Sequence, residues 1–172
     1  MSEGIAAVVA KLASTGRLEI EPTWIPERAI GAFTALFGFP PPTELHSLYD
    51  QRVSSISGHG AFYPGSYSAD GFFETWGEDL KTVGLVPIFY DGFGNDYCAR
   101  VTLGTDVCEV YFIDDNNNYA RPAAAASSIA RFLRIMALAT EEGNSFFDRE
   151  LVRQIDPDIE RCALGPPLYA DG

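Results

Sequence analysis

The chain has 172 residues, of which 47% are hydrophobic and 21% are charged, and this balance is typical of a folded domain rather than a disordered chain. Its formal net charge of −12 disfavours nucleic acid as a partner and favours a basic protein. No apolar run approaches the roughly 20 residues of a membrane helix, and the N-terminus lacks the basic region of a secretion signal. Three cysteines without metal-type spacing suit a reducing compartment, so we expect a cytoplasmic protein that does not bind membranes.

Three helices are predicted in the first fifty residues. Residues 3–15 carry apolar side chains at helical spacing, and Ser2 is placed to cap that helix. A second helix opens between Thr23 and Pro26 and ends before the prolines at 40–42, because proline cannot continue a helix. A third, short helix follows over 42–50. The second helix is expected to bury Ile30, Phe33 and Phe37.

The middle of the chain contains the strongest strand signal. Residues 54–72 are rich in Gly, Ser and Tyr and are interpreted as a long loop or irregular strand, followed by a strand or short helix that bears Trp76. Three short runs rich in Val, Ile, Phe and Tyr then alternate with two turn-rich gaps over 85–113. This pattern predicts a three-stranded meander, and a polar turn follows at 114–118.

Helices are predicted again after the meander. Ser127 or Ser128 would cap a helix over 127–142, on which Arg131 and Arg134 point away from the core. A further helix covers about 146–154, and a last short helix begins at Asp156-Pro157. The predicted fold is therefore a single α+β domain, with helices before and after a central, mostly antiparallel sheet.

The order of these motifs resembles the SUKH superfamily, which includes yeast cell-wall-assembly regulators and bacterial toxin-immunity proteins. The similarity covers a core of about 28–140, flanked by the helix at 3–15 and a C-terminal helical extension at 145–164. The resembling segments are Phe37-Gly38-Phe39-Pro40-Pro41 with Leu45, Leu48 and Tyr49; Trp76; Leu85 to Cys98 with its acidic glycine loop; Val110 to Asp114; and Ser127 to Leu138. The long 54–72 segment and the extension past Asn144 depart from the family pattern.

The resemblance implies a binding module without catalysis or cofactors, often one that neutralises a toxin in the producing cell. Residues 70–120 contain ten acids and two bases, which account for −8 of the net charge. The loop after the first meander strand and the turn after the third should share one end of the sheet. We therefore expect an acidic surface there that occludes a basic toxin domain, for instance a nuclease, with aromatic anchors at its centre. The expected partner-binding residues are Tyr90, Asp91, Phe93, Asn95, Asp96, Asp114, Asp115 and Glu74.

Two other functions stay open from the sequence. One is a regulatory or scaffold domain that binds a cellular partner. The other is a small hydrolase that would use Asp91 with Asp114 or Asp115, because paired carboxylates with different pKa values can act as acid and base.

The remaining chemistry-bearing residues are interpreted as structural. The loop from Asp91 to Asp96 lacks the alternating acids of a calcium loop, so no metal is expected there. Cys98 and Cys108 fall on adjacent predicted strands and are interpreted as buried apolar residues. His46 is assigned to a helix surface, and His59 lies between two glycines in a loop, which is a mobile position for a catalytic base.

Overall fold

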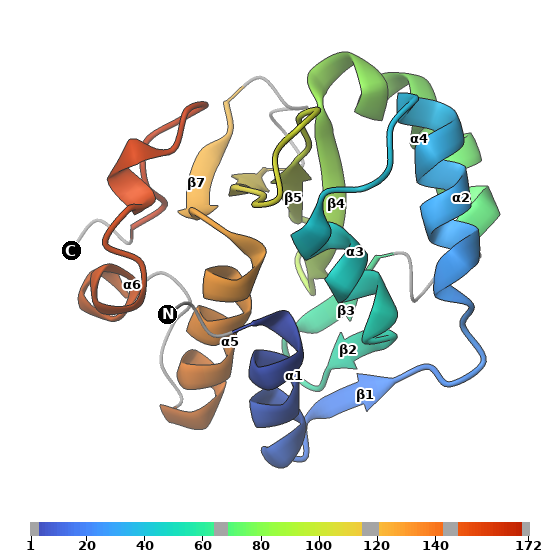
Figure 1. Ribbon diagram of the computed structural model, residues 1–172. Helices are drawn as coiled ribbons and strands as arrows, with labels where there is room; N and C mark the ends of the chain where they lie inside the picture. The colour runs from blue at the N-terminus through green and yellow to red at the C-terminus, as the bar shows by residue number, and fades with distance from the viewer. Residues whose placement is uncertain (1–3, 64–68, 115–120, 143–147, 170–172) are drawn as a thin grey trace.

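The computed structural model describes residues 4–63, 69–114, 121–142 and 148–169, which form an α+β fold around a seven-stranded sheet (Figure 1). In the sheet every strand pairs antiparallel with the next strand of the chain, in the order β1-β2-β3-β4-β5-β6-β7. The strands are β1 Leu18–Ile20, β2 Val53–Ile56, β3 Gly60–Phe62, β4 Leu85–Asp91, β5 Asp96–Arg100, β6 Val110–Ile113 and β7 Ala123–Ala126. The helices are α1 Ile5–Ser14, α2 Pro26–Phe37, α3 Thr43–Asp50, α4 Ala69–Val83, α5 Ile129–Glu142 and α6 Arg149–Ile155, with a 3-10 turn, η1, at Ile159–Arg161.

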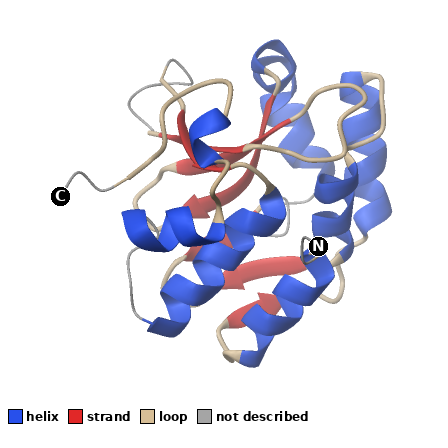
Figure 2. Ribbon diagram, turned by 60° about the vertical axis from the view of Figure 1, so that its left-hand side comes forward, coloured by secondary structure: helices blue, strands red, loops and turns tan. Residues whose placement is uncertain are grey.

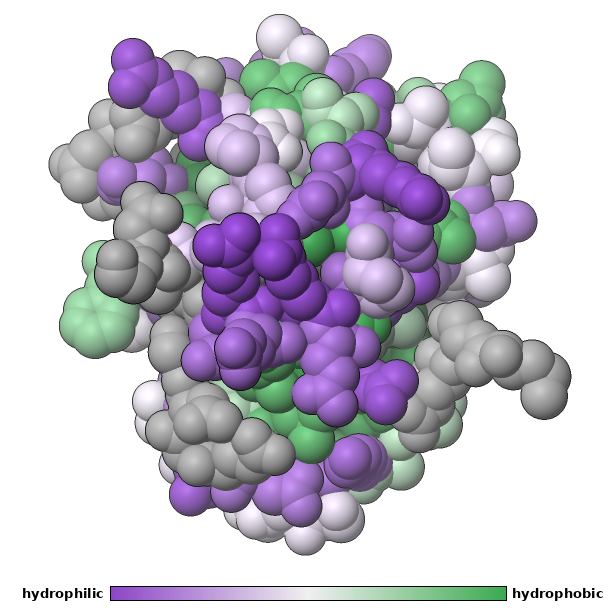
Figure 3. Space-filling model, turned by 90° about the vertical axis from the view of Figure 1, so that its left-hand side faces the viewer, coloured by the Kyte–Doolittle hydropathy of each residue, from purple (hydrophilic) through white to green (hydrophobic). Residues whose placement is uncertain are grey.

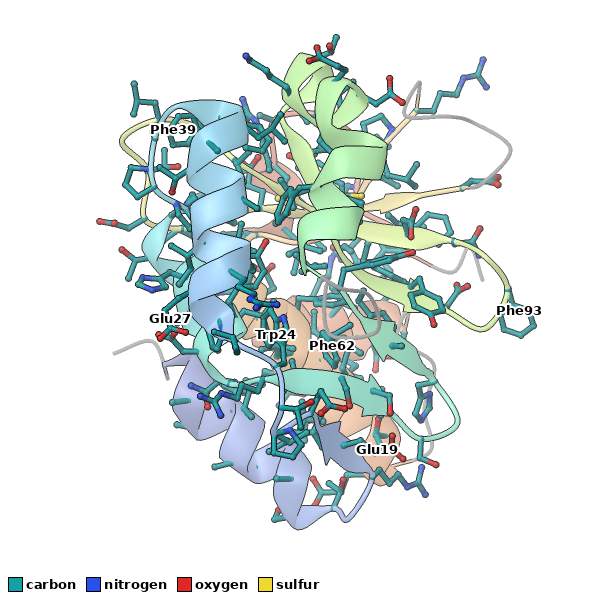
Figure 4. The ribbon with its side chains drawn as sticks, turned by 90° about the vertical axis from the view of Figure 1, so that its right-hand side faces the viewer. Glu19, Trp24, Glu27, Phe39, Phe62 and Phe93 are labelled. Atoms are coloured by element: carbon teal, nitrogen blue, oxygen red, sulfur yellow. The ribbon has the colours of Figure 1, made fainter. Side chains whose placement is uncertain are left out.

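Helices cover both faces of the central strands. Figures 1 and 2 show α1 and α5 on one side of the sheet, and Figure 4 views the molecule from the side of α2 and α4. Phe89 on β4 and Tyr97 on β5 face α5, where both rings contact Phe132. On the other side, Phe73 of α4 packs edge-on against Phe33 of α2. The three consecutive residues 97–99 of β5 are all buried, as expected for a strand covered on both faces.

The helix ends follow from local sequence. Pro26 occupies the first turn of α2, where its missing amide is harmless, and Gly38 ends that helix with a φ of 79°. Ser128 caps α5 by accepting a hydrogen bond from the Arg131 N–H at 3.1 Å, which confirms one of the two predicted caps. The predicted cap at Ser2 lies outside the described residues, and Gly4 holds the N-cap position of α1 without a side-chain hydrogen bond.

The structure extends the predicted meander in both directions. Of the two interpretations of the 54–72 segment, a long loop or an irregular strand, the strand applies to its first part, because β2 ends at Ile56 and β3 occupies Gly60–Phe62. Trp76 belongs to a helix of fifteen residues, α4. Cys108 lies in the loop before β6 rather than on a strand, although it is buried as expected. Within the described residues, no helix has the length and apolarity needed to cross a lipid bilayer.

Candidate protein-binding site

One end of the sheet gathers most of the residues expected to bind a partner. The strand β4 ends at Asp91 and β5 begins at Asp96, which pairs with Ile113 at the end of β6. Asp114 follows Ile113 directly, so the two predicted acidic turns share one end of the sheet, as the strand count required. We call this end the hairpin rim, defined by Tyr90, Asp91, Phe93, Asn95, Asp96 and Asp114.

Two predicted site residues are not placed with the rim. Asp115 lies outside the described residues. The backbone of Glu74 belongs to α4, and its side chain is likewise outside what the structure describes.

The carboxylate of Asp91 organises the turn of the β4–β5 hairpin. Its Oδ1 atom accepts hydrogen bonds from the backbone N–H groups of Phe93 at 2.8 Å and Asn95 at 3.0 Å. Its Oδ2 atom accepts a third from the Asn95 side-chain amide at 3.0 Å. Gly94, with a φ of 93°, supplies the left-handed residue that the turn needs. Asp91 is therefore a structural residue of the loop, and its carboxylate is occupied by its own hairpin.

The loop presents Phe93 to solvent. The side chain is 91% exposed, the highest value among the exposed large hydrophobic residues of the described chain. Figure 4 shows it at the tip of the hairpin, pointing away from the body of the molecule. Beside the loop, the ring of Tyr90 lies 5.1 Å from that of Tyr63 on a half-buried surface. An isolated aromatic ring on an ordered turn is a form that protein-binding anchors take.

The acids of the rim act on the buried groups beneath them. Burial raises the pKa of the Tyr97 hydroxyl, and the negative charge of Asp91 adds to the rise. Burial likewise raises the pKa of the Cys98 thiol, with a further contribution from Asp96. Both groups are therefore neutral at physiological pH, and Cys98 does not offer a thiolate.

The end of the sheet that carries the hairpin rim also contains basic residues. The β2–β3 turn lies at the same end, because Gly60 pairs with Asp91, and the Ser57 N–H donates to the Arg17 carbonyl just before β1. His59 sits in this tight turn rather than in a long loop, and its N–H donates to the Ile56 carbonyl at 3.0 Å. Partial burial, followed by the charge of Arg17, lowers the pKa of His59 below 6.5. The imidazole is therefore neutral at pH 7.

The opposite end of the sheet holds a cleft that the sequence did not reveal. This polar cleft has a volume of about 380 Å³ and is lined by Glu44, Val107, Glu109, Ser127, Ser128, Arg131, Asp158, Arg161 and Cys162. It is lined by residues of the β5–β6 loop, the start of α3, the start of α5 and η1. Figure 3 shows hydrophilic side chains gathered over the α6 and η1 side of the molecule. Exposed residues of both charges there include Arg149, Glu150, Arg153, Glu160 and Arg161.

The charged groups of the cleft are held by internal partners. Arg131 donates from Nη1 to Asp156 at 2.8 Å and to Asp158 at 2.9 Å, and Asp156 is fully buried. Asp156 also accepts the N–H and hydroxyl of Ser127. The prediction that Arg131 points away from the core is therefore wrong, since it neutralises a buried carboxylate. From the sequence, Asp156-Pro157 indicates only a helix start, and no local pattern points to this contact with Arg131.

Glu44 likewise uses its carboxylate to hold distant segments together, one of which begins 85 residues later in the chain. Its Oε2 atom accepts the Cys108 N–H at 2.9 Å and the Ile129 N–H at 3.1 Å, so α3 supplies an anion to the N-terminus of α5. Burial, together with the charge of Glu44, raises the pKa of Cys108 to about 12. Burial and the charges of Glu109 and Asp156 raise the pKa of Cys162 to about 12. Both thiols are therefore protonated at neutral pH and are poor nucleophiles.

Neither end of the sheet presents a metal cradle in the described part of the chain. No group of three His, Cys, Asp or Glu side chains is positioned there to hold a metal ion. Comparison of the sequence with family models and curated proteins, and of the structure with solved structures, finds no match. The SUKH resemblance accordingly stays a prediction.

Proposed function

We propose that the protein is a non-enzymatic binding module of the SUKH type, an immunity protein that occludes a basic toxin domain with its hairpin rim. The observation that carries this proposal is the display of Phe93, 91% exposed on a turn that Asp91 fixes with three hydrogen bonds. A preordered anchor loses little conformational entropy on binding, so most of its contact free energy is available for affinity.

Charge supports a basic partner. The molecule carries −12, and the rim that bears the anchor also contributes Asp91, Asp96 and Asp114. An aromatic anchor at an acidic end of the sheet suits a partner surface with an apolar pocket and a basic border, such as the cleft of a nuclease. In the producing cell the complex would form in the cytoplasm and would block the cleft before substrate reaches it.

The hydrolase alternative gains no support from the rim. It requires a carboxylate of Asp91 that can exchange protons with a substrate, whereas donors of its own hairpin surround both oxygens. No specific contact among the described residues favours the regulatory alternative over toxin binding.

The test is to mix the purified protein with the toxin domain encoded by the adjacent gene and to measure the dissociation constant by calorimetry. Phe93→Ala should weaken binding by about 2 kcal/mol, the loss typical of a central aromatic anchor. Leu103→Ala is the matched control, because Leu103 is also an exposed apolar residue, 73% exposed, but lies in the β5–β6 loop at the other end of the sheet. It should bind as the unchanged protein does.

Two results would contradict the proposal. Absence of a complex at low salt would remove immunity as the function. A complex weakened by Leu103→Ala but not by Phe93→Ala would move the binding surface to the opposite end of the sheet.

A further inference from the structure

The two edges of the sheet are protected differently. At β7, the Ala124 N–H donates to the Pro166 carbonyl, and the Ala124 carbonyl accepts the Leu168 N–H, both at 2.7 Å. The C-terminal segment thus covers that edge. At the other border, β1 is the last strand of the sheet, and Figure 1 shows none of the described elements on its outer side. Exposed strand edges are places where a further strand can add.

The register of β1 shows which backbone groups face outward. The Arg17 carbonyl accepts the Ser57 N–H, and the Glu21 N–H donates to the Arg52 carbonyl, so odd-numbered residues bond toward β2. The N–H and C=O groups of Leu18 and Ile20 therefore point to the outer side. The register shift of the β1–β2 pair falls on β2, where Ser54 is the extra residue, so β1 itself is a regular strand.

The side chains of this edge are self-complementary. The sequence from 17 to 21 reads Arg-Leu-Glu-Ile-Glu. If two copies pair antiparallel with Leu18 opposite Ile20, these two residues of each strand form hydrogen-bonded pairs with the other strand. Arg17 of each copy then stands opposite Glu21 of the other copy, which gives two Arg–Glu pairs. Ile20, which is 51% exposed, then contacts the half-buried Leu18 across the interface.

Charge also favours this edge over others for self-association. Residues 4–21 contain two bases, Lys11 and Arg17, and two acids, Glu19 and Glu21, so this segment is neutral within a chain whose net charge is −12. Two acidic molecules approach each other with least repulsion where their local charge is not negative. Figure 4 places Glu19 well apart from Phe93, so this edge is separate from the hairpin rim.

We propose that two copies of this chain associate through β1 in that antiparallel register, which joins two seven-stranded sheets into one. The strand is only three residues long and the interface is small, so the dimer is weak and forms at high protein concentration. The inference does not depend on the proposed toxin binding, because it concerns a different surface.

The register makes a charge-swap experiment decisive. Sedimentation velocity at about 0.15 M salt, from about 10 μM to about 1 mM protein, should show a monomer–dimer equilibrium. Arg17→Glu alone and Glu21→Arg alone should each weaken the dimer by about tenfold, because two attractive pairs become repulsive. The double variant should restore the original dimerisation. Leu103→Arg, at the far end of the sheet, is the control and should leave it unchanged.

A second variant reports on the register itself. Glu19 lies opposite Glu19 of the other copy on the two-fold axis, and like charges directly opposite are unfavourable. Glu19→Gln should therefore tighten the dimer by about twofold to threefold. A protein that stays monomeric throughout this range, or single reversals that leave the dimer intact, would overturn the proposal. A double variant whose dimer is no tighter than those of the single variants would also overturn the proposal.

Discussion

At the scale of single residues, several side chains hold segments that are distant in sequence. Glu44 connects α3 to the start of α5, and Asp156 connects η1 to the Ser127–Arg131 region. Carboxylates hydrogen-bonded to backbone N–H groups are among the stronger polar contacts in proteins. Each of these acids therefore stabilises the junction where the sheet meets the C-terminal helices.

His59 leads to a prediction about pH. Its pKa in the folded protein is lowered by burial and by Arg17, so below pH 6.5 the unfolded chain binds a proton more readily than the folded one. The contribution of His59 to stability is therefore present above pH 6.5 and is lost as the pH falls below that value. When the pH is lowered from about 7.5 to about 5.5, the free energy of unfolding of His59→Asn should fall by less than that of the unchanged protein, as measured by urea unfolding.

Ser57→Ala, in the same turn as His59, is the control for this measurement. Its side chain is exposed and carries no titratable group, so this variant should retain the full pH dependence of the unchanged protein. Equal losses of stability in His59→Asn and in the unchanged protein would show that His59 is not responsible.

At the scale of elements, the C-terminal segment acts as an outer neighbour of β7. Gly165 lies so close to that strand that a Cβ atom there would stand 1.9 Å from the Pro122 carbonyl oxygen. Beyond it, the guanidinium groups of Arg149 and Arg153 lie over the ring of Tyr169, at 5.4 and 5.5 Å from its centroid. The segment is thus held by backbone, packing and cation–π contacts.

Gly165→Ala should detach this segment, because two backbones would have to separate. We expect a loss of about 1–3 kcal/mol in unfolding free energy and faster hydrogen exchange of the Ala124 amide. Gly31→Ala, in an open position on α2, should instead stabilise the protein by about 0.5–1 kcal/mol. An unchanged exchange rate at Ala124 in Gly165→Ala would show that the segment tolerates the methyl group.

The elements also show why sequence patterns found some parts of the fold and missed others. The strands β4 to β6 and the helices other than α4 have clear periodicity or β-branched and aromatic runs, and the sequence predicts them within a few residues. The strand β7 is four alanines, which favour helices, and β3 is Gly-Ala-Phe, so neither carries a strand signal of its own. Pairing with neighbours, which is a long-range effect, makes them strands.

The same reasoning applies to the two ends of the sheet. The hairpin rim could be assembled from the sequence because counting antiparallel strands places alternate turns together. The polar cleft could not, because Glu44, Glu109, Ser127 and Asp158 are brought together only by the tertiary fold. Its ion pairs join elements that share no local motif.

At the scale of the whole molecule, negative charge is concentrated in the first two thirds of the chain. Residues 1–120 contain 16 acids and 6 bases, and residues 121–172 contain 8 acids and 6 bases. The net charges of these parts are therefore −10 and −2. An approaching basic protein therefore experiences an attractive field.

This field gives the proposed complex a measurable kinetic signature. The association rate constant should fall by about tenfold or more when salt rises from about 0.05 M to about 0.5 M, because screening weakens long-range attraction. Phe93→Ala should mainly raise the dissociation rate constant and leave the salt dependence of association unchanged. Stopped-flow measurements separate these effects, and a salt-independent association rate would contradict electrostatic guidance.

The late position of the segment that covers β7 also affects how the chain matures. The outer hydrogen bonds of Ala124 come from residues 166 and 168, which the ribosome adds more than forty residues later. At synthesis rates of about 5–20 residues per second, a nascent sheet would expose its alanine border for a few seconds. Chaperones that bind unpaired strands would have their opportunity during that interval.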